Sequence, residues 1–269
     1  MAPPRLDALP IGSQHPRIRE LLALRKDASP DRIMVEGCWE HGQLLDSNTD
    51  IDAFFWCPEA GSRTAGCAAR VAARAAEVFR ISEKLLARLT RRGRSDGLLS
   101  VARLPVWRPQ ELSFDASSLV LVADGVEYAG NLGTLIRTVD AARADCLVLT
   151  SRRARLTHPT VYAASRGMVL TTPVVEFDQI PDAADWLRRY GFRVHLADPD
   201  ATGGYRAAAY RGSPTAFVVG SEGTGLAKEW HEQGFGAVSI PMLGQADSLN
   251  VALSAGILLF EARARKDGW

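Results

Sequence analysis

The feature that most constrains the fold is a series of short, continuous apolar segments in the second half of the chain. Segments of this length are typical of parallel strands that are buried on both faces. Helical patterns lie between most of them or after the last one, most clearly at 135–142, 181–189 and 249–263. This alternation predicts an α/β domain with a mostly parallel sheet over residues 118–269. The apolar segments occupy 118–124, 146–149, 194–197, 216–219 and 238–240.

The first 105 residues also alternate between strand and helix patterns, which predicts a second, smaller α/β domain over 1–105. Ser82 is expected to cap the helix that follows it. Pro105, Pro109 and the polar residues around them predict a linker over 106–117. The expected strands are 32–37, 51–56, 78–81 and 98–102, and the expected helices are 15–26, 39–45, 65–76 and 82–89.

Composition places the chain among ordinary globular proteins and says little about its partners. Of the 269 residues, 46% are hydrophobic, and 32 basic residues nearly balance 31 acidic ones. The four cysteines lack the spacing of zinc ligands, so no metal is expected. No apolar stretch is long enough to cross a membrane, and the first ten residues lack an apolar signal core. We therefore expect a cytoplasmic protein without a membrane partner.

Three polar or glycine-rich segments follow strands of the second predicted sheet, where ligands gather in open α/β folds. In the first segment, residues 130–138, Asn131 opens a loop and Arg137 lies in the first turns of the following helix. The pair could aim an amide and a guanidinium into one cleft, where the guanidinium would grip a phosphate. The structural alternative is a helix cap and a surface arginine.

The second segment, residues 219–226, carries glycines in the pattern GxxGxG, which fits neither the dinucleotide-binding nor the P-loop motif. The glycines could let a ligand approach the main chain, or Glu222 could simply cap the following amides. The third segment, 239–252, runs from a strand through Pro241 to a helix opened by Ser248 and Asn250. Both side chains could be caps, yet three such segments in this order are poorly explained as independent accidents.

Together the segments resemble the three motifs of the TrmH/SpoU branch of the SPOUT methyltransferases, over about residues 118–265. The most specific features are Ser248-Leu249-Asn250 after Ile240-Pro241-Met242, and Asn131 six residues before Arg137. The resemblance implies S-adenosylmethionine as cofactor, S-adenosylhomocysteine as product and a ribose 2′-hydroxyl of RNA as methyl acceptor. It also implies a deep trefoil knot, an exception to the general absence of knots, and a homodimer formed through the knotted domain.

The resemblance also assigns roles to individual residues. Arg137 would activate or orient the 2′-hydroxyl, because a guanidinium acts as a base only if strongly perturbed. The amide, carboxylate and hydroxyl groups of the motifs would hold the ribose and the loops: Asn131, Glu222, Ser248 and Asn250. The residues expected to bind the cofactor are Leu196, Gly220, Ser221, Ile240, Met242, Ser248 and Leu249, together with Arg166, which would reach the cofactor's carboxylate or the RNA.

The region before residue 105 is more weakly similar to the family's L30e-like substrate-binding domain, through Val35-Glu36-Gly37 and the strand before Pro105. Asp124-Gly125-Val126 and Ser165-Arg166-Gly167 resemble members that modify 23S ribosomal RNA and confer thiostrepton-type resistance. Many relatives have a proline shortly before the motif asparagine, whereas residues 127–130 lack one, which leaves the substrate open.

Two basic stretches are expected to contact RNA phosphates, although solvated loop charge is the alternative. They contain Arg88, Arg91, Arg92 and Arg94 in one, and Arg152, Arg153 and Arg155 in the other. We favour 23S ribosomal RNA as the substrate, with transfer RNA as the alternative. A catalytically silent RNA-binding or ribosome-assembly factor is a third hypothesis, which predicts the loss of motif residues.

Overall fold

The computed structural model describes residues 8–26, 29–90, 96–221 and 223–268. The chain forms two compact units, one of Met1–Pro105 with Thr157–Thr171 and one of Val106–Leu156 with Thr172–Trp269. This division differs from the sequence-based one, because residues 157–171 pack with the first unit and the expected linker 106–117 packs with the second. The functional domain limits inferred from the sequence, 1–105, 106–117 and 118–269, remain a proposal beside these compact units.

The first unit is built on a five-stranded mixed sheet in the order β1-β4-β3-β5-β2. β5 runs antiparallel to both β2 and β3, whereas the pairs β1–β4 and β3–β4 are parallel. The strands are β1 (Leu9–Pro10), β2 (Arg32–Glu36), β3 (Ile51–Trp56), β4 (Ala75–Arg80) and β5 (Leu98–Arg103).

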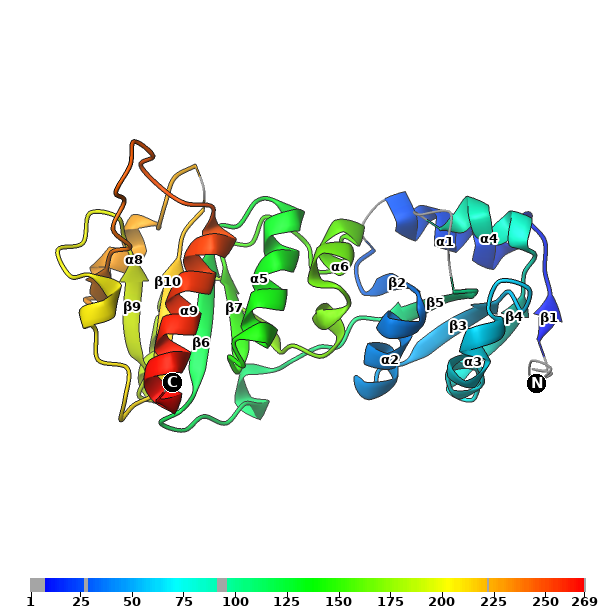
Figure 1. Ribbon diagram of the computed structural model, residues 1–269, viewed down its shortest axis with the longest axis horizontal. Helices are drawn as coiled ribbons and strands as arrows, with labels where there is room; N and C mark the ends of the chain where they lie inside the picture. Colours follow the sequence, from blue (N-terminus) through cyan, green and yellow to red (C-terminus); the bar gives the residue numbers. More distant parts are fainter. Residues whose placement is uncertain (1–7, 27–28, 91–95, 222, 269) are drawn as a thin grey trace. The chain divides into compact units, whose positions relative to one another are not determined.

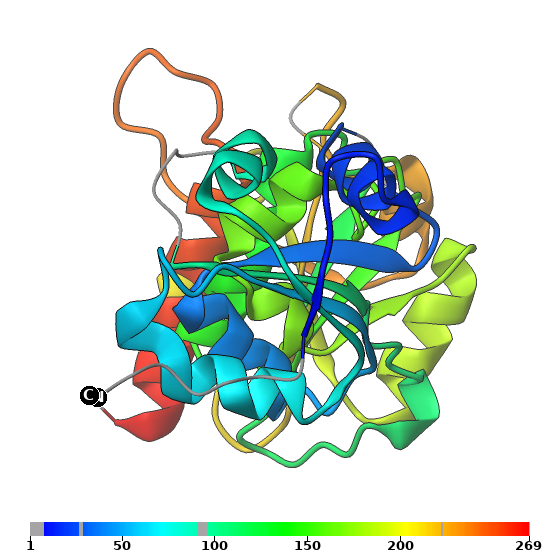
Figure 2. The ribbon, with the colours of Figure 1, turned by 90° about the vertical axis from the view of Figure 1, so that its right-hand side faces the viewer.

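Helices cover both faces of this sheet. α1 (Pro16–Lys26) and α4 (Glu83–Leu89) lie on one face, and α2 (Cys38–Asp46) and α3 (Ala65–Ala72) lie on the other, as Figures 1 and 2 show. Ser82 caps α4 as expected, since its hydroxyl accepts from the amide of Leu85 at 3.3 Å. The short helices of this unit are η1 (Ser62–Thr64), α6 (Pro159–Ser165) and η3 (Met168–Leu170).

The alanine-rich stretch was predicted to be helical to Ala76, but the helix ends at Ala72 and β4 begins at Ala75. Pairing of β4 with β1 and β3 overrides the high helix propensity of alanine. Phe79 at the end of β4 is only 6% exposed and stacks on Phe55 of β3 at 5.4 Å between ring centroids. Burial of these rings in the core is gained only when the segment is a strand.

His41 of α2 is completely buried in the first unit. Its Nδ1 lies 2.6 Å from the carbonyl oxygen of Gly37, and its Nε2 lies 2.9 Å from Oγ of Ser100. Burial lowers the pKa of His41 to about 4, against the opposing effects of the Gly37 hydrogen bond and the nearby charge of Asp96. The imidazole is therefore neutral in the folded protein at neutral pH.

We expect stability to fall as pH is lowered from about 6.5 to about 4, because the unfolded chain then takes up a proton that folded His41 does not. The contribution from His41 amounts to about 1 kcal/mol between pH 7 and pH 5.5. Urea unfolding of the wild type and of His41→Gln at several pH values measures it. The variant should show a smaller loss of stability on acidification, and equal slopes would contradict the assignment. The buried His195, whose pKa is also lowered to about 4, contributes equally to both proteins.

The second unit contains a six-stranded sheet in the order β11-β9-β10-β6-β7-β8, and every strand pair in it is parallel. This confirms the expected α/β architecture with a parallel sheet. β8 was not predicted, because a three-residue strand has too little apolar pattern to distinguish it from a loop. The strands are β6 (Leu119–Asp124), β7 (Cys146–Thr150), β8 (Val174–Glu176), β9 (Arg193–Ala197), β10 (Thr215–Val219) and β11 (Gly236–Val238).

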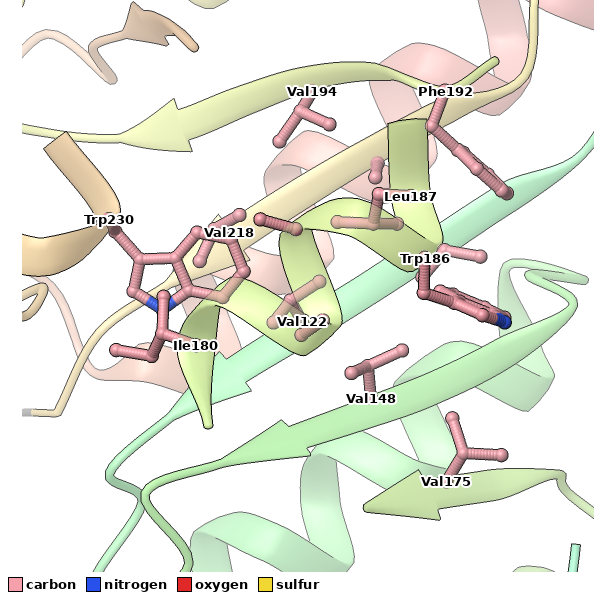
Figure 3. Close-up of a cluster of buried hydrophobic side chains, with 14 of the residues drawn as sticks. Val122, Val148, Val175, Ile180, Trp186, Leu187, Phe192, Val194, Val218 and Trp230 are labelled. Carbon is pink, nitrogen blue, oxygen red and sulfur yellow. The ribbon is translucent and has the colours of Figure 1, made fainter. Parts of the chain in front are cut away.

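Helices enclose this second sheet as well (Figure 1). α5 (Ala129–Ala141) and α9 (Val251–Asp267) contact each other and pack on one face of the sheet. α7 (Ile180–Arg189) packs on the other face, where Val122, Val148 and Val218 from three neighbouring strands point toward it (Figure 3). The remaining short helices are α8 (Lys228–Glu232), η2 (Pro109–Glu111) and η4 (Tyr205–Ala207).

α5 begins at Ala129, six residues earlier than predicted, and so Asn131 lies in its first turn instead of in a loop. Gly130 and Gly133 have poor helix propensity, which obscured this turn in the sequence. Burial of Leu132 and Leu135 against the rest of the unit stabilises the turn. Among the described residues, no helix is both long enough and apolar enough to cross a membrane.

Candidate active site

The strand order of the second unit reverses between β6 and β10. β7 and β8 lie to one side of β6, and β10, β9 and β11 lie to the other. Because all strands are parallel, their carboxyl ends share one edge, and a crevice forms there where the order reverses. The three segments singled out in the sequence all begin at this edge.

A pocket of about 400 Å³ lies at this edge, within the range of pockets that hold small molecules. Its wall combines main chain from glycine-containing loops with apolar side chains and several carboxylates. The lining comes from four segments of the chain, within 197–200, 219–226, 238–242 and 247–254, and also includes His231.

The loop after β10 is a tight turn. Ser221 and Gly225 exchange two backbone hydrogen bonds of 3.1 and 3.0 Å, and Oγ of Ser221 lies 2.8 Å from Oγ1 of Thr224. Gly225 has φ of +66°, which glycine adopts without strain. Gly220 must also be glycine, since a Cβ there would lie 2.2 Å from the carbonyl carbon of Gly225. The loop thus presents bare main chain to the pocket.

Asp124, at the end of β6, ties this loop to the sheet. The residue is 3% exposed, and its Oδ1 accepts hydrogen bonds from Thr150 at 2.9 Å and Ser151 at 2.7 Å. Its Oδ2 accepts from the amide of Ala227 at 3.1 Å. In the sequence, Asp124 was recognised only as part of the family resemblance. A carboxylate that ends a continuous apolar strand was the available signal for this structural role.

The first and third segments meet through their asparagines. Nδ2 of Asn250 donates to Oδ1 of Asn131 at 3.2 Å, although the two residues are far apart in the sequence. Oδ1 of Asn250 accepts from the amide of Ala252 at 2.9 Å and so caps α9. The side-chain amide of Asn250 therefore caps α9 and also joins the first segment to the third, so the two roles are not alternatives.

Most of the residues proposed to bind the cofactor line the pocket: Gly220, Ser221, Ile240, Met242, Ser248 and Leu249. The side chain of Leu196 instead lies in the hydrophobic core, 1% exposed, one residue before the lining residue Ala197. Oγ of Ser248 donates to the carboxylate of its neighbour Asp247 at 3.4 Å. Glu222 lies outside the described residues.

Two of the proposed arginines are not in the pocket wall. Arg137 is exposed on α5, and it is absent from the described lining. Arg166 has φ of +56° at the end of α6 and lines a separate cavity within the first unit. Within the second unit the two asparagines and the pocket loops come together, and neither arginine is among the described residues that line the pocket.

The acidic part of the pocket wall was not predicted from the sequence. Asp198 and Asp200 follow β9, and Asp247 belongs to the third segment. Oδ2 of Asp198 lies 3.9 Å from Nδ1 of His231. These carboxylates favour a ligand that carries positive charge. The available signal was the pair Asp198 and Asp200 directly after the predicted strand 194–197, although two carboxylates at that place have no distinctive spacing.

The arginines of the two basic stretches differ in whether they form ion pairs with carboxylates of the protein. Arg152 pairs with Glu176 at 2.6 Å, and Arg153 pairs with Glu127, so both are partly neutralised. Arg155 and Arg88 are exposed and make no side-chain ion pair with a described residue. The other proposed RNA contacts, Arg91, Arg92 and Arg94, lie outside the described residues.

A parallel sheet with a pocket at its strand-order reversal, lined by main chain, is the arrangement in which α/β proteins bind small cofactors. Residues 118–260, more than half of the chain, match the model of the SpoU rRNA methylase family. The chain belongs to that family. This confirms the resemblance inferred from the three segments.

Similar proteins agree with this assignment. The structure of an AdoMet-bound rRNA methyltransferase from Sinorhizobium meliloti superposes with a TM-score of 0.84 at 26% identity, covering 95% of this chain and 97% of that one. A structure described as an RNA 2′-O ribose methyltransferase gives a TM-score of 0.77 at 30% identity, covering 96% and 98%.

A protein of Staphylococcus haemolyticus assigned to the TrmH family of tRNA/rRNA methyltransferases is 32% identical over 149 residues, or 55% of this chain. The match spans 59% of the length of that curated relative.

Proposed function

We propose that this protein transfers a methyl group from S-adenosylmethionine to a ribose 2′-hydroxyl of RNA, and that this RNA is 23S ribosomal RNA. The observation that carries the proposal is the hydrogen bond between Asn131 and Asn250 beside the pocket. It joins the first and third segments of the family-matched region at one place. Capping of α9 by Asn250 would not by itself require a contact with Asn131 in the first turn of α5.

The residues of the pocket fit S-adenosylmethionine. Gly220 leaves the main chain of the loop bare, and Ile240, Met242 and Leu249 offer apolar surface to an adenine ring. Asp198, Asp200 and Asp247 complement the positive charge that the sulfonium gives the cofactor. When bound, S-adenosylmethionine supplies an electrophilic methyl group.

The protein's own residues would then position the acceptor hydroxyl. Asn131 and Asn250 hold the ends of α5 and α9 together, and Ser248 lines the pocket beside them. Arg137 would orient the hydroxyl and a neighbouring phosphate and stabilise the developing alkoxide. Glu222 would support the loop after β10. We infer that the arginine acts as an electrostatic group, since a guanidinium stays protonated in proteins.

We further propose that two copies form the active enzyme through the second unit. Leu253 and Phe260 are seven residues apart on α9, so they share one face of the helix, and they are 60% and 42% exposed. A second copy would cover this apolar face. It would also explain the position of Arg137, because the guanidinium of one copy would then complete the pocket of the other.

Replacement of Leu253 and Phe260 by aspartate should convert the dimer to a monomer, because the charges would lose their hydration in the interface. Light scattering coupled to size-exclusion chromatography measures the mass. Val106→Asp, at an apolar residue that is 83% exposed outside α9, is the control and should leave the mass unchanged. A double variant with the wild-type mass would refute this interface.

Two finer features of the fold belong to the same proposal. The segment from Ser239 to Asn250 would be threaded to form the trefoil knot, supported by the parallel bridge between Ser239 and Gly204 that ties its start to the loop after β9. The first unit would be an L30e-like domain that binds the RNA substrate. Its support is the mixed sheet covered by helices on both faces.

The proposed function is tested by incubating the protein with tritiated S-adenosylmethionine and either 23S ribosomal RNA or transfer RNA, each without its natural methylation. We expect label in the 23S transcript, and mass spectrometry of the nucleosides should find it on a ribose 2′-oxygen. Label on transfer RNA alone would favour the second candidate, which the tRNA/rRNA assignment of the Staphylococcus relative keeps open. Failure to bind the cofactor in calorimetry would favour a silent RNA-binding factor.

A further inference from the structure

The first unit contains a cavity that the proposed methyl transfer does not use. It measures about 210 Å³, below the usual range for drug-sized ligands, and is close in size to a single planar heterocycle. One part of its wall is apolar, formed by Leu24, Ile33 and Met34. The other part carries charged side chains, including Glu40 of α2 and Arg166, the residue that follows α6.

Several polar groups of this wall are already committed to the protein. Arg25 donates to the carbonyl oxygen of Arg88 at 2.6 Å, and Oδ2 of Asp96 accepts from the amide of Cys38 at 3.0 Å. The hydroxyl of Tyr162 accepts from the amide of Glu36 at 3.3 Å, and burial raises the pKa of this tyrosine. These bonds hold the wall in shape.

Glu40 and Arg166 are different, because neither side chain forms a hydrogen bond or ion pair with a described residue. They lie close to each other, since a Cβ on Gly167, the residue after Arg166, would be 3.3 Å from Cγ of Glu40. The carboxylate of Glu40 lies over Gly37, where a Cβ would be 2.8 Å from Oε2. The cavity therefore offers one uncommitted acceptor group beside one uncommitted donor group.

We propose that this cavity binds one unstacked guanine base of the RNA, an inference that rests on the proposed function in taking RNA as the substrate. A carboxylate can accept the N1 and N2 hydrogens of guanine together, while a guanidinium donates to its O6 and N7. Adenine presents only one donor group to the carboxylate, and uracil presents one N–H. The apolar wall packs against the face of the ring, as in other sites that bind a base taken out of the stack.

The helix that contributes Glu40 to the wall of this cavity also carries an exposed aromatic residue. Trp39 is 59% exposed in the first turn of α2, between the lining residues Gly37 and Glu40. An indole that faces water at such a position is a stacking platform for a base of single-stranded RNA. Trp39 holds the nucleotide next to the guanine and contributes affinity without base preference.

Fluorescence anisotropy with labelled short oligouridylates tests this assignment in the full-length protein. One oligonucleotide carries a central guanosine, a second carries inosine, which lacks the 2-amino group, and a third carries adenosine. We expect the guanosine form to bind about tenfold or more tighter than the adenosine form, as one specific base contact commonly provides. The inosine form should lie between them.

Glu40→Gln should abolish the preference for guanosine, because one of the two acceptor oxygens becomes an NH2 donor that faces a guanine N–H, while binding of plain oligouridylate stays unchanged. Glu83→Gln, at an exposed glutamate in the first turn of α4, is the matched control and should keep the preference. Trp39→Leu should weaken all the oligonucleotides about tenfold and keep their order. Circular dichroism checks that each variant is folded.

Equal binding of the three oligonucleotides by the wild type, or a preference that survives Glu40→Gln, would refute the guanine pocket. So would calorimetric binding of a free amino acid such as methionine, with no heat from guanosine, because a small zwitterion also suits a carboxylate beside a guanidinium. The proposed function is tested separately by methyl transfer. A guanosine preference without methyl transfer to any RNA would refute the proposed function and would still support the guanine pocket.

Discussion

Replacement of Gly220 by alanine should weaken the binding of S-adenosylmethionine by about a hundredfold or more, in line with the usual cost of overpacking. The added Cβ would lie 2.2 Å from the carbonyl carbon of Gly225 and 2.4 Å from the amide nitrogen of Leu226. Both are main-chain atoms, so no side-chain rotation relieves the overlap, and the loop after β10 must move. Isothermal titration calorimetry with S-adenosylmethionine and S-adenosylhomocysteine measures the loss.

Gly223→Ala is the matched control in the same loop, because a Cβ there would meet no atom within 4 Å. It should bind the cofactor as the wild type does. Thermal unfolding shows whether the rest of the unit stays folded in both variants. Wild-type affinity in Gly220→Ala would mean that the loop does not hold the cofactor.

Replacement of Arg137 by alanine should lower the rate of methyl transfer by about a hundred- to a thousandfold, the usual effect of removing one electrostatic group at a reacting oxygen. Cofactor binding should be unchanged, because Arg137 is exposed on α5 and is not among the described residues that line the pocket. Single-turnover methylation of RNA measures the rate, and calorimetry measures the binding. Retained turnover would remove Arg137 from the reaction.

A mixture of two inactive variants distinguishes whether Arg137 serves its own chain or a second copy. In a heterodimer of Arg137→Ala and Gly220→Ala, one pocket is intact, and the partner subunit supplies an intact arginine. If the arginine acts across the dimer, mixing and refolding the two variants restores activity. If the arginine acts within its own chain, each active site lacks either the arginine or an intact pocket, and the mixture stays inactive.

Much of the fold could be predicted from local pattern. The continuous apolar runs of β6 and β10 predicted buried parallel strands, because a strand covered on both faces has no polar side. The cap at Ser82 was equally local, since a hydroxyl bonds an amide three residues on. The prediction failed at β4 and at the start of α5, where pairing and burial override intrinsic propensity.

The candidate site was predicted in part for the same reason. Glycines and the Ser248–Asn250 triplet are recognisable along the chain, and the loops that carry them do line one pocket. The acidic wall at Asp198 and Asp200 was missed, because a carboxylate after a strand has no distinctive spacing. The surroundings of Arg166 could not be predicted from local pattern either, because the residues that line a cavity with it come from α2 and β2, which are distant in the sequence.

The sequence by itself determined the class of protein, because the order of strands and the identity of the motif residues are properties of the chain alone. Only the tertiary structure decided which of these residues meet. Asn131 and Asn250 are joined because β6 lies beside β10 and α5 packs on α9. Neither Arg137 nor Arg166 is among the described residues that line the pocket, because which residues meet depends on packing between distant segments, which local spacing does not specify.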